Sequence, residues 1–152
     1  MVKALIVDDE EKCRISLKKL IADHCPQVVI SDEADGVGSG LEKTERLNPE
    51  LIFLDVEMQD GTGFDLIGRL PKNKYKIIFT TAFSQYAVEA FKYSAIDYLL
   101  KPIEQNQLIS AVEKAVTMKY LHDMDKKLEI LLENRNGFEK LALSCQEGIE
   151  MV

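Results

Sequence analysis

Three aspartates stand at the ends of two short apolar runs, where their carboxylates could do chemistry together. Asp8 and Asp9 follow the run 3–7, and Asp55 closes the run 50–55. Short runs rich in branched residues are typical of buried parallel strands. The carboxyl ends of parallel strands share one edge of a sheet, so the three carboxylates are expected in one pocket. Carboxylates crowded in this way repel one another, and a bound hard cation such as Mg2+ removes that cost.

A hydroxyl and an amine end two further apolar runs. Thr81 ends the run 76–81 and Lys101 ends the run 96–101, which places both on the same rim as the acids. A metal ion, an amine and a hydroxyl around one carboxylate form a cradle for a phosphoryl group, whose charge is spread over three oxygens. The central carboxylate can then act as a nucleophile and form an acyl phosphate.

The elements that must position these groups alternate along the chain. Strands alternating with helices predict an α/β fold: a doubly wound, five-stranded parallel sheet with helices on both faces and right-handed crossovers. In the strand order 2-1-3-4-5, the order reverses between the first and third strands, whose ends bear the aspartates. The expected strands cover 3–7, 28–30, 50–55, 76–81 and 96–101, and the expected helices lie near 15–21, 41–47, 64–70, 85–93 and 104–134.

Composition and charge argue against two classes of function, nucleic-acid binding and membrane spanning. The 152 residues include 19 Lys and Arg against 26 Asp and Glu, a net charge of −7, whereas a nucleic-acid-binding domain draws its affinity from a basic surplus. No apolar run approaches the roughly 20 residues that span a bilayer, and the first residues lack the pattern of a signal peptide. We therefore expect a cytoplasmic, acidic domain that contacts no membrane and does not bind DNA by itself.

Each of these polar residues also has an ordinary structural explanation. A single Asp at a strand end is commonly a turn or cap residue. Thr81 alone is typical of an N-terminal helix cap, and Lys101 alone is typical of a solvated strand end. The combination favours a site: acids after the first and third strands, a hydroxyl after the fourth and an amine after the fifth.

The segments that carry these residues resemble the receiver domain of bacterial two-component response regulators. The resemblance extends from Lys3 to about Tyr120. It rests on the segments 7–10 (VDDE), 54–58 (LDVEM), 80–83 (TTAF) and 97–102 (DYLLKP). It implies the flavodoxin-like receiver fold with an extended C-terminal helix, and phosphoryl transfer from a sensor histidine kinase. It also implies that the protein is not a turnover enzyme, but only phosphorylates itself from a donor and slowly dephosphorylates itself.

By this resemblance Asp55 is the phospho-acceptor. Asp9 is implied to bind Mg2+ directly and Asp8 partly through water, together with Asp55 and the backbone carbonyl of Glu57. Gln59 departs from the family, in which proline is common at this position. That departure affects the expected stiffness of the loop and leaves the chemistry unchanged.

The resemblance also assigns a switch. Thr81 is implied to follow the phosphoryl group and Lys101 to pair with it, and the Lys101–Pro102 bond is implied to be cis. Tyr98 takes the place of the switch aromatic, which turns inward when Thr81 moves. The expected result is a changed face formed by the fourth helix, fifth strand and fifth helix, through which a homodimer forms.

Several residues beside the pocket have two interpretations. Tyr86, Phe91 and Tyr93 lie near the switching face, and for Phe91 we prefer plain core packing. Glu57 and Phe83 flank the pocket and are candidates for setting how fast water attacks the acyl phosphate.

The segment 83–98 resembles one subgroup, regulators with a DNA-binding output domain of the LytTR (LytR/AlgR-like) type, and thus transcription regulation. The tail 140–150 resembles the first hairpin of that output domain. The expected organisation is a receiver domain over 1–121, a helical linker over 122–136 and an N-terminal output fragment over 137–152. The chain would then be a regulator cut shortly after its output domain begins, binding DNA only through the missing part. The stripe from Leu121 to Leu131 would extend the dimer seam or be an exposed linker.

Three other functions stay open. A Mg2+-dependent phosphohydrolase also uses an aspartyl nucleophile, but usually has a second Asp two residues later, where this chain has Glu57. Flavin binding on a flavodoxin-like fold needs hydroxyl and glycine residues after the first strand, where this chain has acids at 8–11. The third is a receiver-like interaction module that never takes phosphate.

Overall fold

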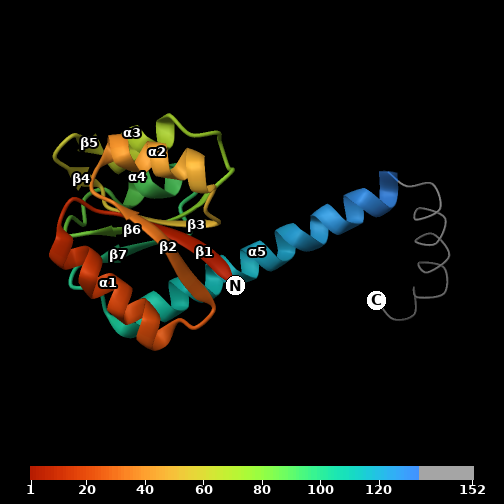
Figure 1. The fold of residues 1–152 in the computed structure, drawn as a ribbon, viewed down its shortest axis with the longest axis horizontal. Coiled ribbons are helices and arrows are strands. Elements are labelled where there is room, and N and C mark those ends of the chain that lie inside the picture. The colour runs from red at the N-terminus through yellow and green to blue at the C-terminus, as the bar shows by residue number, and fades with distance from the viewer. Residues whose placement is uncertain (134–152) are drawn as a thin grey trace. The chain divides into compact units, whose positions relative to one another are not determined.

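A computed structural model describes residues 1–133, and it confirms the predicted fold class. Within these residues, five parallel strands form one sheet in the order β2-β1-β3-β6-β7 (Figure 1). They are β1 (Val2–Val7), β2 (Val28–Ala34), β3 (Leu51–Leu54), β6 (Lys76–Thr81) and β7 (Asp97–Leu100). The order is the predicted 2-1-3-4-5, because β4 and β5 form a separate small pair.

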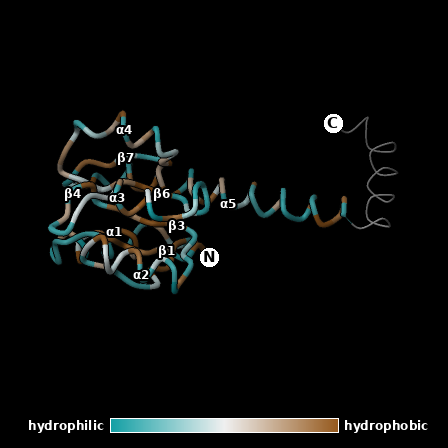
Figure 2. Tube along the Cα trace, turned by 90° about the horizontal axis from the view of Figure 1, so that it is seen from above, coloured by the Kyte–Doolittle hydropathy of each residue, from teal (hydrophilic) through white to brown (hydrophobic). Residues whose placement is uncertain are grey.

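Helices cover both faces of this sheet. α1 (Glu11–His24) and the first turns of α5 (Gln105–Glu133) pack on one face, and α2 (Val37–Leu47), α3 (Gly63–Gly68) and α4 (Ala87–Lys92) pack on the other (Figure 1). Successive strand residues point to opposite faces, so Ile6 belongs to the core under α1 and α5 and Val7 to the core under α2, α3 and α4. Figure 2 shows the hydrophobic segments concentrated in the strands between these layers.

The loop after Asp55 contains a small antiparallel pair, β4 (Glu57–Met58) and β5 (Gly61–Thr62). Gly61 has φ +145°, a backbone conformation that other residues rarely adopt. Before it, Asp60 reaches across to α2 and accepts hydrogen bonds from the backbone N–H groups of Val37 (2.8 Å) and Gly38 (3.0 Å). These bonds, that of Gly38 first, hold the pKa of Asp60 below its usual range. The loop therefore supplies the N-terminal cap of α2.

The edge strand β2 runs to Ala34, four residues beyond the predicted end at 30. Its last part is polar, because Asp32 and Glu33 occupy it. Glu33 pairs with Arg14 on one side, and Asp32 lies 3.5 Å from the ammonium of Lys43 on the other. Ion pairing on both faces therefore lets acidic residues extend a strand that an apolar pattern alone would end earlier.

The last helix, α5, crosses the boundary at Val116 between the two compact units of the chain. In the first unit, Leu108, Ala111, Val112 and Ala115 are fully buried. In the second, the described residues 117–133 continue the helix, and the side chains of the predicted stripe are 43–55% exposed. The predicted tail hairpin and output fragment 137–152 lie outside the described residues, and the domain boundaries stay predictions. In the described part of the chain, no helix is both long and apolar enough to cross a membrane.

Candidate functional site

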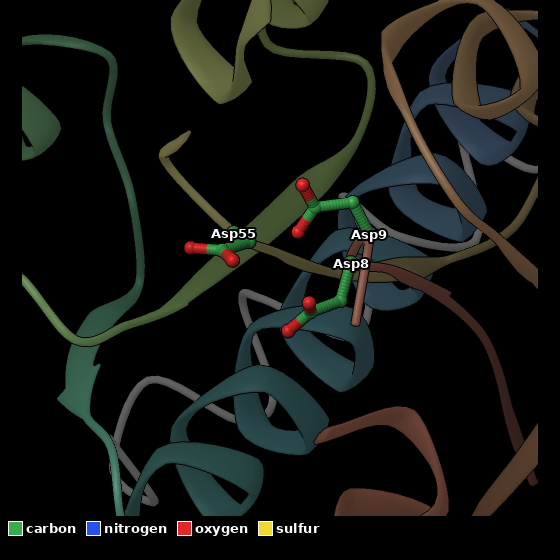
Figure 3. Close-up of side chains that lie close together, drawn as sticks. All are labelled: Asp8, Asp9 and Asp55. Atoms are coloured by element: carbon green, nitrogen blue, oxygen red, sulfur yellow. The ribbon is translucent and has the colours of Figure 1, made fainter. Parts of the chain in front are cut away.

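The three predicted carboxylates come together at the carboxyl edge of the sheet. Asp8 and Asp9 follow β1, and Asp55 follows the neighbouring strand β3. Each can offer an oxygen that lies within 4.8 Å of the others, and Figure 3 shows the three carboxyl groups next to one another. Asp8 and Asp55 are buried and Asp9 is partly exposed, so the cluster opens to solvent beside Asp9.

Close backbone packing fixes the position of Asp55. Its N–H donates to the carbonyl of Val7 (2.9 Å), and the N–H of Gly63 donates to the carbonyl of Val56 (2.8 Å). A Cβ at position 63 would lie 2.5 Å from the carbonyl oxygen of Asp55. Only glycine fits at this position, because no backbone atom can approach a Cβ so closely.

Lys101 pairs with two of the three acids. Its Nζ lies 2.7 Å from Oδ2 of Asp8 and 3.1 Å from Oδ2 of Asp55. The Lys101 side chain is only 16% exposed, so the interpretation of a solvated strand end is wrong. Its backbone N–H donates to the carbonyl of Thr81 (2.8 Å), and the following bond to Pro102 is cis, as the resemblance implies.

Burial and charge act in opposite directions on these groups. Burial raises the pKa of the Asp55 carboxyl; the Lys101 ammonium opposes this, and the Asp8 carboxylate adds to it. Burial alone would lower the pKa of Lys101, but hydrogen bonds and charges from Asp8 and Asp55 outweigh it and raise that pKa. At neutral pH the pocket therefore holds a fixed ammonium that offsets part of the acidic charge.

One oxygen of Asp55 is left for another partner. Oδ2 binds Lys101, whereas Oδ1 is buried and has no hydrogen-bond partner among the described residues. A buried, unpaired carboxylate oxygen is costly. The carboxylates of Asp8, Asp9 and Asp55 together form an all-oxygen donor set, which is the set that Mg2+ prefers. The residues present therefore fit a Mg2+ ion.

Thr81 and Tyr98 both form a hydrogen bond with Phe83, in the loop after β6. The Thr81 hydroxyl is buried and accepts a hydrogen bond from the N–H of Phe83 (3.3 Å). The hydroxyl of Tyr98 donates to the carbonyl of the same Phe83, and its ring packs 6.1 Å from that of Phe79. Thr81 does not cap the next helix, because α4 begins six residues later at Ala87.

Two hydrogen bonds at the rim of the pocket could not be predicted from the sequence. The hydroxyl of Tyr86 donates to a carboxylate oxygen of Glu57 (2.6 Å), which raises the pKa of the tyrosine. Arg14 in α1 donates to the backbone carbonyl of Asp8 (2.7 Å). Both link residues that are far apart in sequence or on different elements, so only the folded chain reveals them. The carboxylate of Glu57 is thus hydrogen-bonded to Tyr86. This bond does not involve the backbone carbonyl of Glu57, which is the group that the resemblance assigns to the metal.

Comparison with known proteins agrees with this geometry. The model of the family described as "Response regulator receiver domain" matches residues 4–113.

The chain belongs to this family.

Two curated relatives match most or all of this chain. The sensory transduction protein LytT of Bacillus anthracis is 35% identical over 159 residues, covering 100% of this chain and 62% of that protein. The transcriptional regulatory protein BtsR of Escherichia coli is 32% identical over 140 residues, covering 91% of this chain and 56% of that protein. The receiver chain thus spans less than two thirds of the length of these relatives.

A solved structure shows the same architecture. The response regulatory domain of protein mrkE from Klebsiella pneumoniae aligns with a TM-score of 0.70 and 32% identity, covering 76% of this chain and 96% of that one. The receiver family consists of two-component signalling proteins, so membership favours this function over a phosphohydrolase or a flavin-binding protein.

Proposed function

We propose that this receiver domain accepts a phosphoryl group on Asp55 from the phosphohistidine of a sensor histidine kinase. A carboxylate oxygen of Asp55 forms the O–P bond while the P–N bond breaks, and the imidazole leaves with the electron pair of that bond. The single observation that carries the proposal is the state of Asp55: buried, held by Lys101 through one oxygen, and unpaired at the other.

The pocket residues would position and stabilise the transferred group. Lys101 is held 3.1 Å from the Asp55 carboxylate and would face the charge that develops on the phosphoryl oxygens. The Thr81 hydroxyl would turn from Phe83 to a phosphoryl oxygen. Asp8, Asp9, Asp55 and the backbone carbonyl of Glu57 would hold Mg2+. When bound, Mg2+ would neutralise charge on the carboxylates and the phosphoryl group.

Mass spectrometry after incubation with acetyl phosphate and Mg2+ tests the acceptor. We expect one phosphoryl adduct, on the peptide that contains Asp55, and none in Asp55→Asn. Asp60→Asn is the matched control, because Asp60 lies in the same loop but its carboxylate is bonded to α2. An adduct in Asp55→Asn at the wild-type level would refute the assignment. Uptake of radiolabel by Asp55→Asn from a phosphorylated kinase at the wild-type level would refute it as well.

Phosphorylation would act through the face formed by α4, β7 and α5. Phe91 is 60% exposed on α4, so the prediction of core packing for it is wrong. Val88 is 73% exposed on the same helix, and Leu100 at the end of β7 is 42% exposed. Leu100 also lines a hollow of about 390 Å³ between β7 and the start of α5. These apolar side chains support a homodimer across this face once Thr81 and Tyr98 rearrange.

Sedimentation with and without beryllofluoride, a phosphoryl mimic, tests the dimer. We expect a shift from monomer to dimer in wild type and none in Phe91→Asp. Ile15→Asp is the control, because Ile15 is 54% exposed but lies on α1, which is not part of the face formed by α4, β7 and α5. A wild-type protein that stays monomeric with the mimic would refute dimerisation.

The longer protein would couple this dimer to DNA. Support comes from the relatives, which exceed this chain in length and include a transcriptional regulatory protein. The proposed LytTR-type output domain would follow a receiver domain over 1–121 and a linker over 122–136. The exposed stripe from Leu121 to Leu131 would extend the dimer seam along the linker.

Two alternative functions predict different results. A phosphohydrolase would turn over a small phosphate ester, and a module that takes no phosphate would show no adduct on Asp55.

A further inference from the structure

Arg14 on α1 connects the acidic pocket with the neighbouring edge strand. Its Nη1 donates to the backbone carbonyl of Asp8 (2.7 Å), and its Nε donates to a carboxylate oxygen of Glu33 (2.9 Å). The Arg14 side chain is 14% exposed. Its charge is therefore held by these two protein acceptors more than by water.

The Glu33 end of this link is itself fixed. Lys18 donates to the other carboxylate oxygen of Glu33, and Lys43 donates to its backbone carbonyl. Hydrogen bonds from Lys18 and from Arg14 hold the pKa of Glu33 below its usual range, so it is ionised at neutral pH. A planar guanidinium has donors in a rigid fork. With one arm of the fork anchored at β2, the other arm is held in place against Asp8.

The carbonyl of Asp8 belongs to the peptide group that joins Asp8 to Asp9. The orientation of this peptide determines the directions in which both side chains leave the backbone. We infer that Arg14 is a positioning residue of the pocket: it holds the Asp8–Asp9 peptide so that both carboxylates face the cation site. The inference rests on the proposed function, because Mg2+ binding is part of that proposal. Groups that orient metal ligands from outside typically change metal affinity by about 10–100-fold.

Two variants of the 152-residue chain separate positioning from simple ion pairing. Arg14→Met removes both bonds. Lys18→Met removes a cation from the same Glu33 carboxylate but leaves the Arg14–Asp8 bond in place. Mg2+ is titrated into each 15N-labelled protein, and the dissociation constant is taken from the amide shifts of Asp9 and Asp55. Urea unfolding of the metal-free proteins is measured alongside.

We expect Arg14→Met to weaken Mg2+ binding about tenfold, the lower end of the range for such groups, and Lys18→Met to leave it unchanged. A purely structural ion pair would lower the unfolding free energy in both variants without changing the dissociation constant of the folded molecules. An unchanged constant in Arg14→Met, or the same weakening in both variants, would overturn the inference.

A third variant keeps the test decisive if Arg14→Met does not fold. Arg14→Lys keeps the charge but lacks the planar fork that spans the two acceptors, so we expect weaker Mg2+ binding than in wild type. An unchanged dissociation constant in Arg14→Lys would overturn the role of Arg14. Wild type that binds no Mg2+ would refute the proposed function itself, which distinguishes the two failures.

Discussion

Replacing Lys101 with methionine should remove a large part of the stability of this domain at neutral pH. The ammonium lies 2.7 Å from Asp8 and 3.1 Å from Asp55, whose side chains are only 4% and 6% exposed. Removing one partner of a buried ion pair leaves an uncompensated charge and destabilises by about 3–5 kcal/mol. We expect a loss of about 3 kcal/mol, the lower end of that range, because the pocket opens to solvent beside Asp9. Domains of this kind have total stabilities of about 5–15 kcal/mol.

Urea denaturation followed by circular dichroism, without divalent cations, measures this loss. Lys114→Met is the matched control, because Lys114 pairs with Asp97 at a similar distance (2.9 Å) but is 55% exposed. Exposed pairs contribute only about 0–1 kcal/mol. Adding Asp8→Asn to Lys101→Met should recover part of the unfolding free energy. This second substitution removes one of the two buried carboxylate charges, those of Asp8 and Asp55, that Lys101→Met leaves without a partner. A loss in Lys101→Met no greater than in Lys114→Met would refute the reasoning.

Three further predictions follow from the same pocket. Because burial raises the pKa of Asp55, its ionised form destabilises the folded state; Asp55→Asn should therefore be more stable than wild type at neutral pH, and thermal melts should show this difference vanish as the pH falls below about 4. A difference that is constant with pH would contradict this. Gly63→Ala, whose Cβ would lie 2.5 Å from a backbone oxygen, should lose about 1–3 kcal/mol of unfolding free energy, whereas Gly68→Ala, with nothing within 4 Å, should lose none; equal melting temperatures would exclude the clash. Tyr86→Phe removes the hydroxyl bonded to Glu57 and should shorten the lifetime of the phosphorylated form by loosening the loops over the pocket, without moving the unfolding midpoint; an unchanged lifetime would count against a role for this bond.

The convergence of the acids was predictable from sequence because strand direction determines it. Asp8 and Asp55 each follow an apolar run, and in a parallel sheet such ends meet at one edge whatever the loops do. Lys101 was predicted on the same rim for the same reason. Its bonds to two acids at once depend on side-chain packing, which the strand pattern does not determine.

Other features depend on contacts that no local pattern encodes. The strands β4 and β5 have two residues each, too short for any periodicity to show. Phe91 lies in a six-residue helix, and so short a helix with apolar residues on both sides does not indicate which side is buried. The Arg14 side chain that bonds to Asp8 also bonds to Glu33, which lies in the acidic end of β2, where ion pairs compensate the charges.

The cap that Asp60 provides to α2 constrains how this domain could be re-engineered. The segment between Asp55 and Gly63 is fixed at both ends and again at Asp60, which reaches Val37 and Gly38. A Cβ at Gly36 would lie 2.6 Å from the same carboxylate. Chimeras that exchange this segment with that of another regulator should therefore transplant residues 36–38 together with it. In a grafted segment of different length, the carboxylate of Asp60 would no longer reach the backbone N–H groups at the start of α2.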